Sequence, residues 1–274
     1  MPTQLNHPIG IFDSGVGGLS VLRCIRQELP HQDLIFIADQ AHVPYGPRPL
    51  VEVRGFADAI TRFLLHQGCP LIVVACNAAS AAALKTLRQT FPNVPFVGME
   101  PAVKPAAEQT HTGVVGVLAT PATFQGELYA SVVERFANGV VLLQDTCPGL
   151  VGQIEKGDLD GPRTRNILMQ AIEPMLKKGI DTIVLGCTHY PFVIPLIQEI
   201  VGKKVRVIDP APAVARQTLR MMESHHIQSS SPGAGSTVCF TSDEPEMLST
   251  FIGKSLGIPC SVGRLQWEGD HLVS

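Results

Sequence analysis

The 274-residue sequence predicts an α/β fold with parallel β-sheets, arranged in two similar halves. Short runs rich in isoleucine and valine alternate with longer segments of helical periodicity, an order typical of parallel sheets with helices on both faces. The runs are apolar throughout, as expected for strands buried on both sides. Two of them, LIVVACNAAS from Leu71 and TIVLGCTHYP from Thr182, end alike, with a cysteine followed by small polar residues.

The expected elements follow one another in strict alternation. Strands are predicted at Ile9–Phe12, Leu34–Ala38, Leu71–Ala75, Val94–Gly98, Gly113–Leu118, Val140–Leu143, Thr182–Leu185 and Val205–Ile208. Helices are predicted near residues 19–28, 50–67, 78–90, 121–136, 163–178, 191–201 and 211–223. Parallel neighbours of this kind require right-handed crossovers.

Beyond these elements, the stretch HHIQSSSPGAGS (225–236) is rich in serine and glycine and is expected to be an exposed loop. TVCFTSD, which follows it, predicts a late edge strand. DEPEMLSTFIGKSLG predicts a helix with Asp243 as its N-cap and Pro245 in its first turn.

Two domains are expected from the order of the elements. Residues 1–98 together with 207–274 are predicted to form the first domain, and residues 99–206 the second. The strand Val205–Ile208 could join either sheet, and the helix after it is expected to return to the first domain. A chain of this length suffices for two modest cores.

Composition excludes several classes of function. The net charge of −3 and the lack of a basic run argue against a nucleic-acid-binding surface. The apolar stretches have the length of strands, which is too short to span a membrane. The N-terminus does not resemble a secretory signal. The seven scattered cysteines form no C-x-x-C pair, so we expect reduced thiols and a cytoplasmic location.

Cys76 and Cys187 are the strongest functional candidates. Ligands of open parallel sheets bind beyond the carboxyl ends of the strands, where both cysteines are expected. A helix N-terminus beside a cysteine lowers the pKa of its thiol and raises the thiolate fraction. A single buried cysteine is more often structural, but two in matching contexts favour function. The remaining cysteines, Cys24, Cys69, Cys147, Cys239 and Cys260, lack this context and are expected to be structural.

The stretch IFDSGVGGLSVL places Asp13 and Ser14 between a strand and a glycine-rich helix start. The glycines allow a tight turn and free N–H groups for an anion. Their spacing does not match the G-x-G-x-x-G dinucleotide fingerprint, and Asp13 would repel a pyrophosphate. A small ligand with an ammonium group suits Asp13 better. The alternative is an ordinary turn with an Asp N-cap.

Further candidates follow other strands. Tyr45 and Gly46 lie in the shaped loop ADQAHVPYGPRP and could offer a hydroxyl and an N–H. Thr120 and Thr123 follow the strand ending at Leu118, where capping of the next helix would explain either one.

Glu155 and His189 have competing explanations. Glu155 near the end of a helix is, on sequence alone, expected to be solvated. His189 could relay protons for Cys187, and a structural histidine is about as plausible. Cys187-Thr-His189 lacks the spacing of a zinc site, so no metal is expected.

Two cysteines that face each other across a ligand can invert a stereocentre. One thiolate removes a proton from one face of a carbon, and the other thiol returns a proton to the opposite face. A base whose pKa lies near the working pH is suited to this task. Backbone N–H donors in a dry cleft can stabilise the developing negative charge.

The motifs Asp13-Ser14-Gly15, Pro44-Tyr45-Gly46, Cys76-Asn77 and Cys187-Thr188-His189 together resemble the bacterial cofactor-independent glutamate racemases, over about residues 9–223. The resemblance implies two pseudo-symmetric α/β domains with the active site in the cleft between them. It also implies no cofactor, glutamate as substrate, D-glutamate for peptidoglycan synthesis, and a homodimer.

The resemblance implies roles for individual residues. Cys76 and Cys187 would be the paired acid and base, assisted by Asp13, His189 and Glu155. The substrate's side-chain carboxylate would be bound by Ser14, Tyr45 and Gly46. Its α-carboxylate and amine would be bound by Asn77, Ala78 and Thr188, with Thr120 and Thr123 nearby. The family usually has threonine where this chain has Ala78, so one hydrogen bond worth about 1 kcal/mol is missing there.

Two alternatives remain at this point. The first is a racemase of another acidic amino acid, such as aspartate. The second is a non-catalytic protein that binds an acidic metabolite. Binding alone needs no thiols, so the cysteine pair favours an enzyme.

Overall fold

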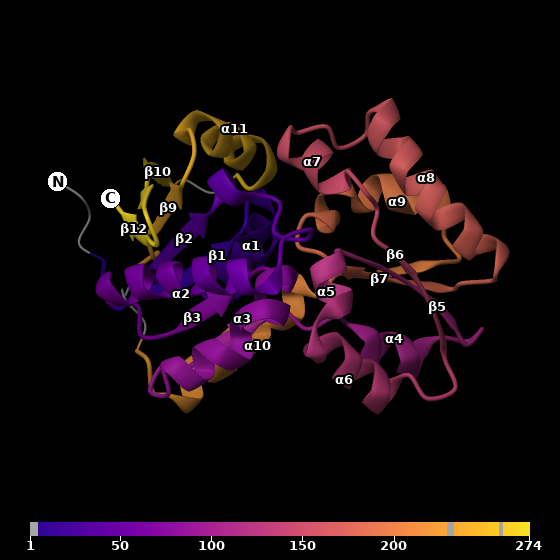
Figure 1. Cartoon of the computed structure of the whole chain (residues 1–274), viewed down its shortest axis with the longest axis horizontal. Helices are drawn as coiled ribbons and strands as arrows, with labels where there is room; N and C mark the ends of the chain where they lie inside the picture. The colour runs from indigo at the N-terminus through magenta and orange to yellow at the C-terminus, as the bar shows by residue number, and fades with distance from the viewer. Residues whose placement is uncertain (1–4, 229–232, 258–259) are drawn as a thin grey trace.

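The computed structural model describes residues 5–228, 233–257 and 260–274, and it confirms the α/β class. Two parallel sheets lie side by side, each with helices on both faces (Figure 1). We refer to the six-stranded sheet and its helices as the first half, and to the four-stranded sheet and its helices as the second half. The division into domains at residues 98 and 207 stays a prediction.

The first half is built on a sheet with the strand order β10-β9-β2-β1-β3-β4. Its strands are β1 (Ile9–Asp13), β2 (Leu34–Ala38), β3 (Ile72–Val74), β4 (Phe96–Gly98), β9 (Thr237–Thr241) and β10 (Ser261–Arg264). Its helices are α1 (Leu19–Glu28), α2 (Leu50–His66), α3 (Asn77–Thr90), α10 (Ala211–Ser224) and α11 (Pro245–Ser255).

Alternate side chains of the buried strand β1 enter two different cores. Ile9 and Ile11 pack with apolar residues of α1 and α10, whereas Phe12 packs with those of α2 and α3. This explains the continuous apolar run in the sequence, because both faces of the strand are covered. The hairpin of β11 (Gln266–Glu268) and β12 (His271–Val273) comes last in the chain and packs against α2.

The second half is built on a sheet with the strand order β6-β5-β7-β8. Its strands are β5 (Val114–Ala119), β6 (Val141–Asp145), β7 (Thr182–Gly186) and β8 (Arg206–Ile208). Its helices are α4 (Val103–Gln109), α5 (Pro121–Gln125), α6 (Glu127–Phe136), α7 (Leu150–Glu155), α8 (Pro162–Lys177) and α9 (Ile194–Val201). β8 pairs with β7, while α10 after it packs on α1 of the first half.

Three expectations were wrong in detail. β9 lies between β2 and β10, so the edge strand is β10, whose half-exposed sequence SVGR carries no apolar run. Asp243 does not cap α11, whose N-cap position is Glu244 with Pro245 next. The helix expected over residues 121–136 breaks at Gly126, where a Cβ atom would lie 2.6 Å from that of Ala81 in α3.

The serine- and glycine-rich stretch lies partly outside the described residues. A turn follows α10 at residues 225–226, and the chain is described again from residue 233. Residues 229–232 fall in the gap, so the expected loop is not tested there. Across the described ranges, no helix has both the length and the apolar character needed to cross a bilayer.

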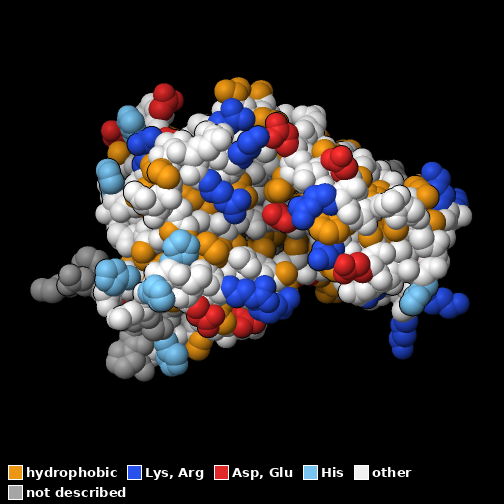
Figure 2. Space-filling model, turned by 90° about the horizontal axis from the view of Figure 1, so that it is seen from below, with side chains coloured by type: hydrophobic (Ala, Val, Ile, Leu, Met, Phe, Trp, Pro, Cys, Tyr) orange, Lys and Arg blue, Asp and Glu red, His pale blue; other side chains and the backbone are white. Residues whose placement is uncertain are grey.

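A wide groove runs between the two halves on the face shown in Figure 2. The chain crosses there near Pro101 and Pro210, and the groove is bordered by the cationic side chains Arg88, Lys104, Arg135 and Arg216. Among the residues that the structure describes, no cysteine or histidine lines it. The groove therefore does not contain the candidate acid–base groups, which lie elsewhere.

Candidate active site

A small cavity with buried walls lies where the carboxyl ends of strands from both halves meet. Only about 10 Å³ of it is open to the centre of a water molecule, roughly the space that one water needs. From the first half it is lined by Ser14, Pro44, Tyr45, Gly46, Cys76, Asn77 and Ala78, and from the second by Thr120, Val151, Cys187, Thr188 and His189. Both candidate thiols thus face one cavity from opposite halves.

Three predicted site residues lie directly behind this lining. Asp13 accepts hydrogen bonds from two of the lining residues, Ser14 and Thr188. The other two are Glu155, which bonds to His189, and Thr123, whose hydroxyl lies 3.2 Å from that of Thr120. The structure therefore gathers every predicted site residue at one place.

Cys76 is linked to a carboxylate through a serine. Its Sγ lies 3.9 Å from Ser14 Oγ, and this hydroxyl donates to Asp13 Oδ1 at 2.9 Å. Cys76 is also the N-cap of α3 and accepts from the N–H of Ala79 at 3.5 Å. That bond lowers the pKa of the thiol. Burial and the charge of Asp13 raise the pKa by more than the bond lowers it, so the net pKa lies well above its ordinary value. The expectation of a lowered pKa was wrong for this thiol because burial outweighs the helix N-terminus.

Asp13 joins the two halves beneath the cavity. Its fully buried carboxylate accepts from Ser14 Oγ, from the N–H of Gly15 at 3.0 Å and from Thr188 Oγ1 at 2.6 Å. Burial raises the pKa of Asp13, and the charge of His189 together with these three donors partly offsets the rise. The Asp13 carboxyl group therefore binds a proton more readily than the carboxyl group of an exposed aspartate.

Cys187 is linked to a second carboxylate through a histidine. Its Sγ lies 3.8 Å from His189 Nδ1, and His189 Nε2 lies 2.5 Å from Glu155 Oε1. Burial lowers the pKa of His189, but the hydrogen bonds to Cys187 and Glu155 outweigh it and raise the pKa well above its ordinary value. The imidazole is thus held as a cation that can pass a proton to or from the thiol.

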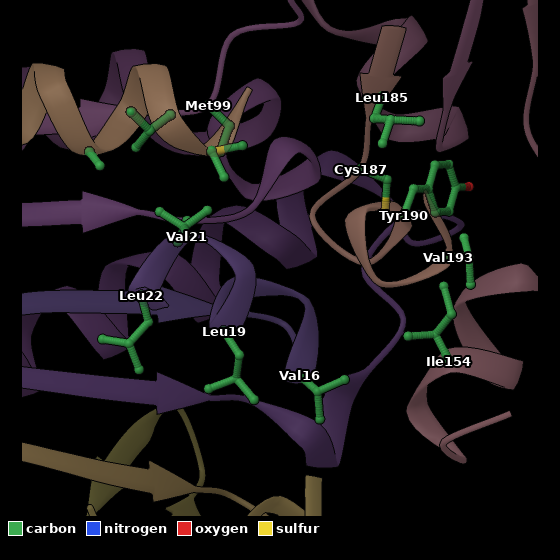
Figure 3. Close-up of a cluster of buried hydrophobic side chains, with 14 of the residues drawn as sticks. Val16, Leu19, Val21, Leu22, Met99, Ile154, Leu185, Cys187, Tyr190 and Val193 are labelled. Atoms are coloured by element: carbon green, nitrogen blue, oxygen red, sulfur yellow. The ribbon is translucent and has the colours of Figure 1, made fainter. Parts of the chain in front are cut away.

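The apolar core determines where Glu155 lies. Ile154, its neighbour in α7, is buried in the cluster that also contains Tyr190 and Val193 (Figure 3). This packing seats α7 against the segment after β7 and directs Glu155 to the first half, where it accepts from the N–H of Val16 at 2.9 Å. The Glu155 side chain is only 10% exposed, so the expectation of a solvated residue from sequence alone was wrong.

Asn77 provides unpaired polar atoms at the cavity. It is the first residue of α3 and is only 3% exposed. Neither its amide nitrogen nor its amide oxygen has a hydrogen-bond partner among the described residues. Buried polar groups are nearly always paired, so this amide is suited to a ligand with both donors and acceptors, such as an amino acid.

Thr120 lies where the resemblance implies and does not cap a helix, whereas the hydroxyl of Tyr45 points to another partner than expected. Thr120 occupies the N-cap position of α5, but its side chain makes no capping bond and lines the cavity. The hydroxyl of Tyr45 donates to Asp39 Oδ2 at 2.6 Å. It cannot donate the same proton to a substrate carboxylate. The Ser14 hydroxyl likewise donates its proton to Asp13, so the N–H of Gly46 is the candidate donor on that wall.

Comparison with known proteins fits this geometry. The family model described as Asp/Glu/Hydantoin racemase matches residues 9–218. The chain belongs to the Asp/Glu/Hydantoin racemase family. Its resemblance to glutamate racemases, inferred from the four motifs, is confirmed by the relatives below.

Several glutamate racemases match over nearly their full length. The glutamate racemase of Roseiflexus sp. (strain RS-1) is 48% identical over 261 residues, which cover 95% of this chain and 96% of that protein. The crystal structure of the isoform RacE1 from Bacillus anthracis superposes with a TM-score of 0.85 at 30% identity, covering 96% of this chain and 98% of the other. The Escherichia coli enzyme, solved with L-glutamate, has a TM-score of 0.82 at 31% identity and covers 96% of this chain and 100% of its own.

Sequence reasoning missed part of this racemase-family site. Val151 lines the cavity from α7, but an apolar residue in a helix gives no functional signal. Gln40, whose side-chain amide donates to Glu155 Oε2 at 3.1 Å, follows β2 at the same sheet edge as Tyr45. Its place two residues after a strand end was the one signal that could have found it.

Replacing Glu155 with glutamine is expected to lower the pKa of His189. The variant keeps the size of the side chain but removes the negative charge that favours the imidazolium. NMR titration of the histidine ring signals measures the change directly. Glu199→Gln, which removes an exposed carboxylate paired with Arg165, serves as control and leaves the pKa of His189 unaltered. An unchanged His189 titration in Glu155→Gln would contradict this electrostatic link.

The same pair links stability to pH. The pKa of His189 is raised in the folded state, so the stabilisation is complete below the unfolded pKa of about 6.5 and disappears as the pH rises through the folded pKa. The melting temperature of Glu155→Gln is therefore expected to fall furthest below that of the wild type near pH 6. The difference should narrow at alkaline pH.

Proposed function

We propose that the protein is a glutamate racemase that interconverts L- and D-glutamate without a cofactor and supplies D-glutamate for peptidoglycan synthesis. The observation that carries this proposal is the pair Cys76 and Cys187, which line one small cavity from opposite halves of the molecule. Each thiol has a hydrogen-bonded route to a buried or nearly buried carboxylate, through Ser14 to Asp13 and through His189 to Glu155.

The reaction needs one proton removed and one returned. In one direction, the thiolate of one cysteine takes the α-proton and becomes a thiol, and the C–H electron pair stays on the substrate carbon and its carboxylate. The thiol of the other cysteine then gives its proton to the opposite face, and the electron pair forms the new C–H bond. The thiol and thiolate exchange roles, so the next turnover runs in reverse unless protons are redistributed. Asp13 and His189 carry out that redistribution in this proposal, which is supported by their contacts to Ser14 beside Cys76 and to Cys187.

The polar groups around the cavity fit the two ends of glutamate. Asn77, Thr188 and the backbone of Ala78 hold the α-carboxylate and the ammonium group. Thr120 and Thr123 lie beside them. Ser14, Gly46 and Tyr45 form the wall for the side-chain carboxylate. Tyr45 and Ser14 contribute no donated proton there, because their hydroxyls are bonded to Asp39 and Asp13.

Binding requires the two halves to separate and close again. Glutamate is far larger than the space that the cavity leaves open in this arrangement of the halves. Contacts that bridge the halves include Thr188 with Asp13, Ser20 with the carbonyl of Thr188, and Ala122 with the carbonyl of Gly46. Closure around the substrate excludes water and strengthens the electrostatic interactions that stabilise the carbanion.

The proposal also includes a homodimer in the cytoplasm. All seven cysteines are free thiols, which suits a reducing compartment. Sedimentation of the purified protein tests the oligomeric state.

Proton NMR of the purified protein with L-glutamate in D₂O, without added cofactor, tests the activity. We expect the α-proton signal to disappear while the circular dichroism of the same sample decays to zero. Exchange of aspartate without exchange of glutamate would make the protein a racemase of another acidic amino acid. Tight glutamate binding in calorimetry without any exchange would instead favour a binding protein.

A further inference from the structure

Asp39 lies outside the reaction cavity and gathers four hydrogen-bond donors on one buried carboxylate. It directly follows β2 and its side chain is 1% exposed. Tyr45 Oη and His42 Nδ1 bond to Oδ2 at 2.6 and 2.9 Å. Ser242 Oγ and Trp267 Nε1 bond to Oδ1 at 2.7 and 2.8 Å. The donors come from the loop after β2, the segment after β9 and the C-terminal hairpin, so this one side chain ties three distant segments together.

An aromatic cluster surrounds the same carboxylate. His42 stacks on Phe56 of α2 with ring centroids 3.9 Å apart. The Trp267 ring is steeply inclined to both, with its centroid 5.0 Å from that of His42 and 5.6 Å from that of Phe56. Tyr45 is tilted against Phe56 at 5.6 Å. Stacked and edge-on pairs of this kind fix ring orientations as well as burying apolar area. The C-terminal hairpin therefore contributes Trp267 to the aromatic cluster that holds the loop carrying Tyr45.

Tyr45 connects this support to the cavity. Pro44, Tyr45 and Gly46 form consecutive parts of the cavity wall, whereas neither Asp39 nor Trp267 lines it. The carbonyl of Gly46 also accepts from the N–H of Ala122 at 3.0 Å, which joins this wall to the second half. A shift of the Tyr45 ring would thus move the wall that faces the substrate's side chain.

We propose that Asp39 and Trp267 are positioning residues that hold the Pro44–Gly46 wall at the distance that fits the side-chain carboxylate of glutamate. The C-terminal hairpin is then part of the substrate-recognition structure, although it never touches the substrate. This inference rests on the proposed function. Its signature is a change in substrate affinity with little change in the α-proton chemistry, which takes place at the two thiols.

The first test is Asp39→Asn, which keeps the shape but replaces one accepting oxygen by a donor. Either Tyr45 and His42 or Ser242 and Trp267 then lose their acceptor. We expect the KM for glutamate to rise roughly tenfold, the size of a lost charge-assisted hydrogen bond, with kcat within about threefold of the wild type. A folded Asp39→Asn enzyme with wild-type KM would overturn the proposal.

A double-mutant cycle with Tyr45→Phe shows whether Asp39 acts through Tyr45. If it does, adding Asp39→Asn to Tyr45→Phe raises KM little further, because the link is already broken. Fully additive effects would overturn the proposed route. The cycle also separates positioning from general destabilisation. If Asp39→Asn only destabilised the fold, its effect on KM would add to that of Tyr45→Phe.

Trp267→Phe tests the hairpin with a smaller change, since it keeps an aromatic ring and removes the N–H donor. We expect KM to rise a few-fold, whereas Glu268→Gln, an exposed neighbour in β11, leaves it unchanged. Equal KM values for Trp267→Phe and Glu268→Gln would show that the hairpin does not position the Pro44–Gly46 wall. Wild-type turnover of glutamate is measured in the same series. An inactive wild type would refute the proposed function itself, whereas an active wild type with unchanged variants would refute only this inference.

Discussion

Replacing either Cys76 or Cys187 with alanine is expected to abolish glutamate racemisation in both directions. A general acid or base contributes about 10²–10⁴-fold to a rate, and each cysteine is required in every turnover, once as base or once as acid. We therefore expect kcat to fall by at least about 10³-fold in each variant. A single base on one side of the cavity cannot deliver a proton to the opposite face without moving across the substrate.

The matched control is Cys69→Ala. Cys69 is also a buried free thiol of the first half, but it lies in the core and does not line the cavity. Its loss should lower the melting temperature and leave kcat within about twofold, since removal of a buried sulfur affects packing alone. Full turnover by Cys76→Ala or Cys187→Ala would refute the two-thiol mechanism.

Serine variants separate chemistry from shape at the same positions. Cys76→Ser and Cys187→Ser keep nearly the same volume, yet a serine hydroxyl is far harder to ionise than a thiol. Both should therefore be nearly as inactive as the alanine variants while their melting temperatures stay closer to that of the wild type. Activity in the serine variants would indicate that these positions only shape the cavity.

The sequence predicted the strands better than it predicted the connections between them. Continuous apolar runs such as Leu34–Ala38 identify buried parallel strands because both faces are covered, and that strand has the expected limits. β10 was missed since an edge strand needs little apolar surface. The break at Gly126 depends on the close approach of α3, a tertiary contact with no local signal.

The residues of the candidate site likewise fall into two groups, those that local sequence could predict and those that depend on tertiary packing. Residues directly after strand ends, such as Asp13, Cys76 and Cys187, could be predicted because the topology of parallel sheets brings those ends to one edge. Glu155 could not be predicted from periodicity, since its burial depends on how α7 packs on the cluster around Ile154. Asp39 and Trp267 are 228 positions apart, so only the folded structure reveals their hydrogen bond.

Replacing Asn77 with alanine is expected to weaken glutamate binding and to stabilise the protein. The side chain is buried, and neither amide atom is paired within the described residues. Leaving such groups buried and unpaired costs about 1–3 kcal/mol, and alanine removes this cost while favouring the helix at the start of α3. The melting temperature should therefore rise by about 2–4 °C for each kcal/mol gained.

The same substitution removes a donor and an acceptor that face the substrate. We expect the KM for glutamate to rise at least about tenfold, as for the loss of hydrogen bonds to a charged ligand. Calorimetry of unfolding and steady-state racemisation measure the two effects on one sample. Asn93→Ala, at an exposed position after α3, is the control and should change neither.

The opposite signs make the Asn77 experiment decisive. A residue needed only for folding would lose stability when truncated, and a residue irrelevant to both would change neither quantity. Lower stability with unchanged KM would mean that the amide is paired in solution and does not serve the substrate. Higher stability with weaker binding is the expected pattern for a polar group whose buried position is retained for function at the expense of the fold.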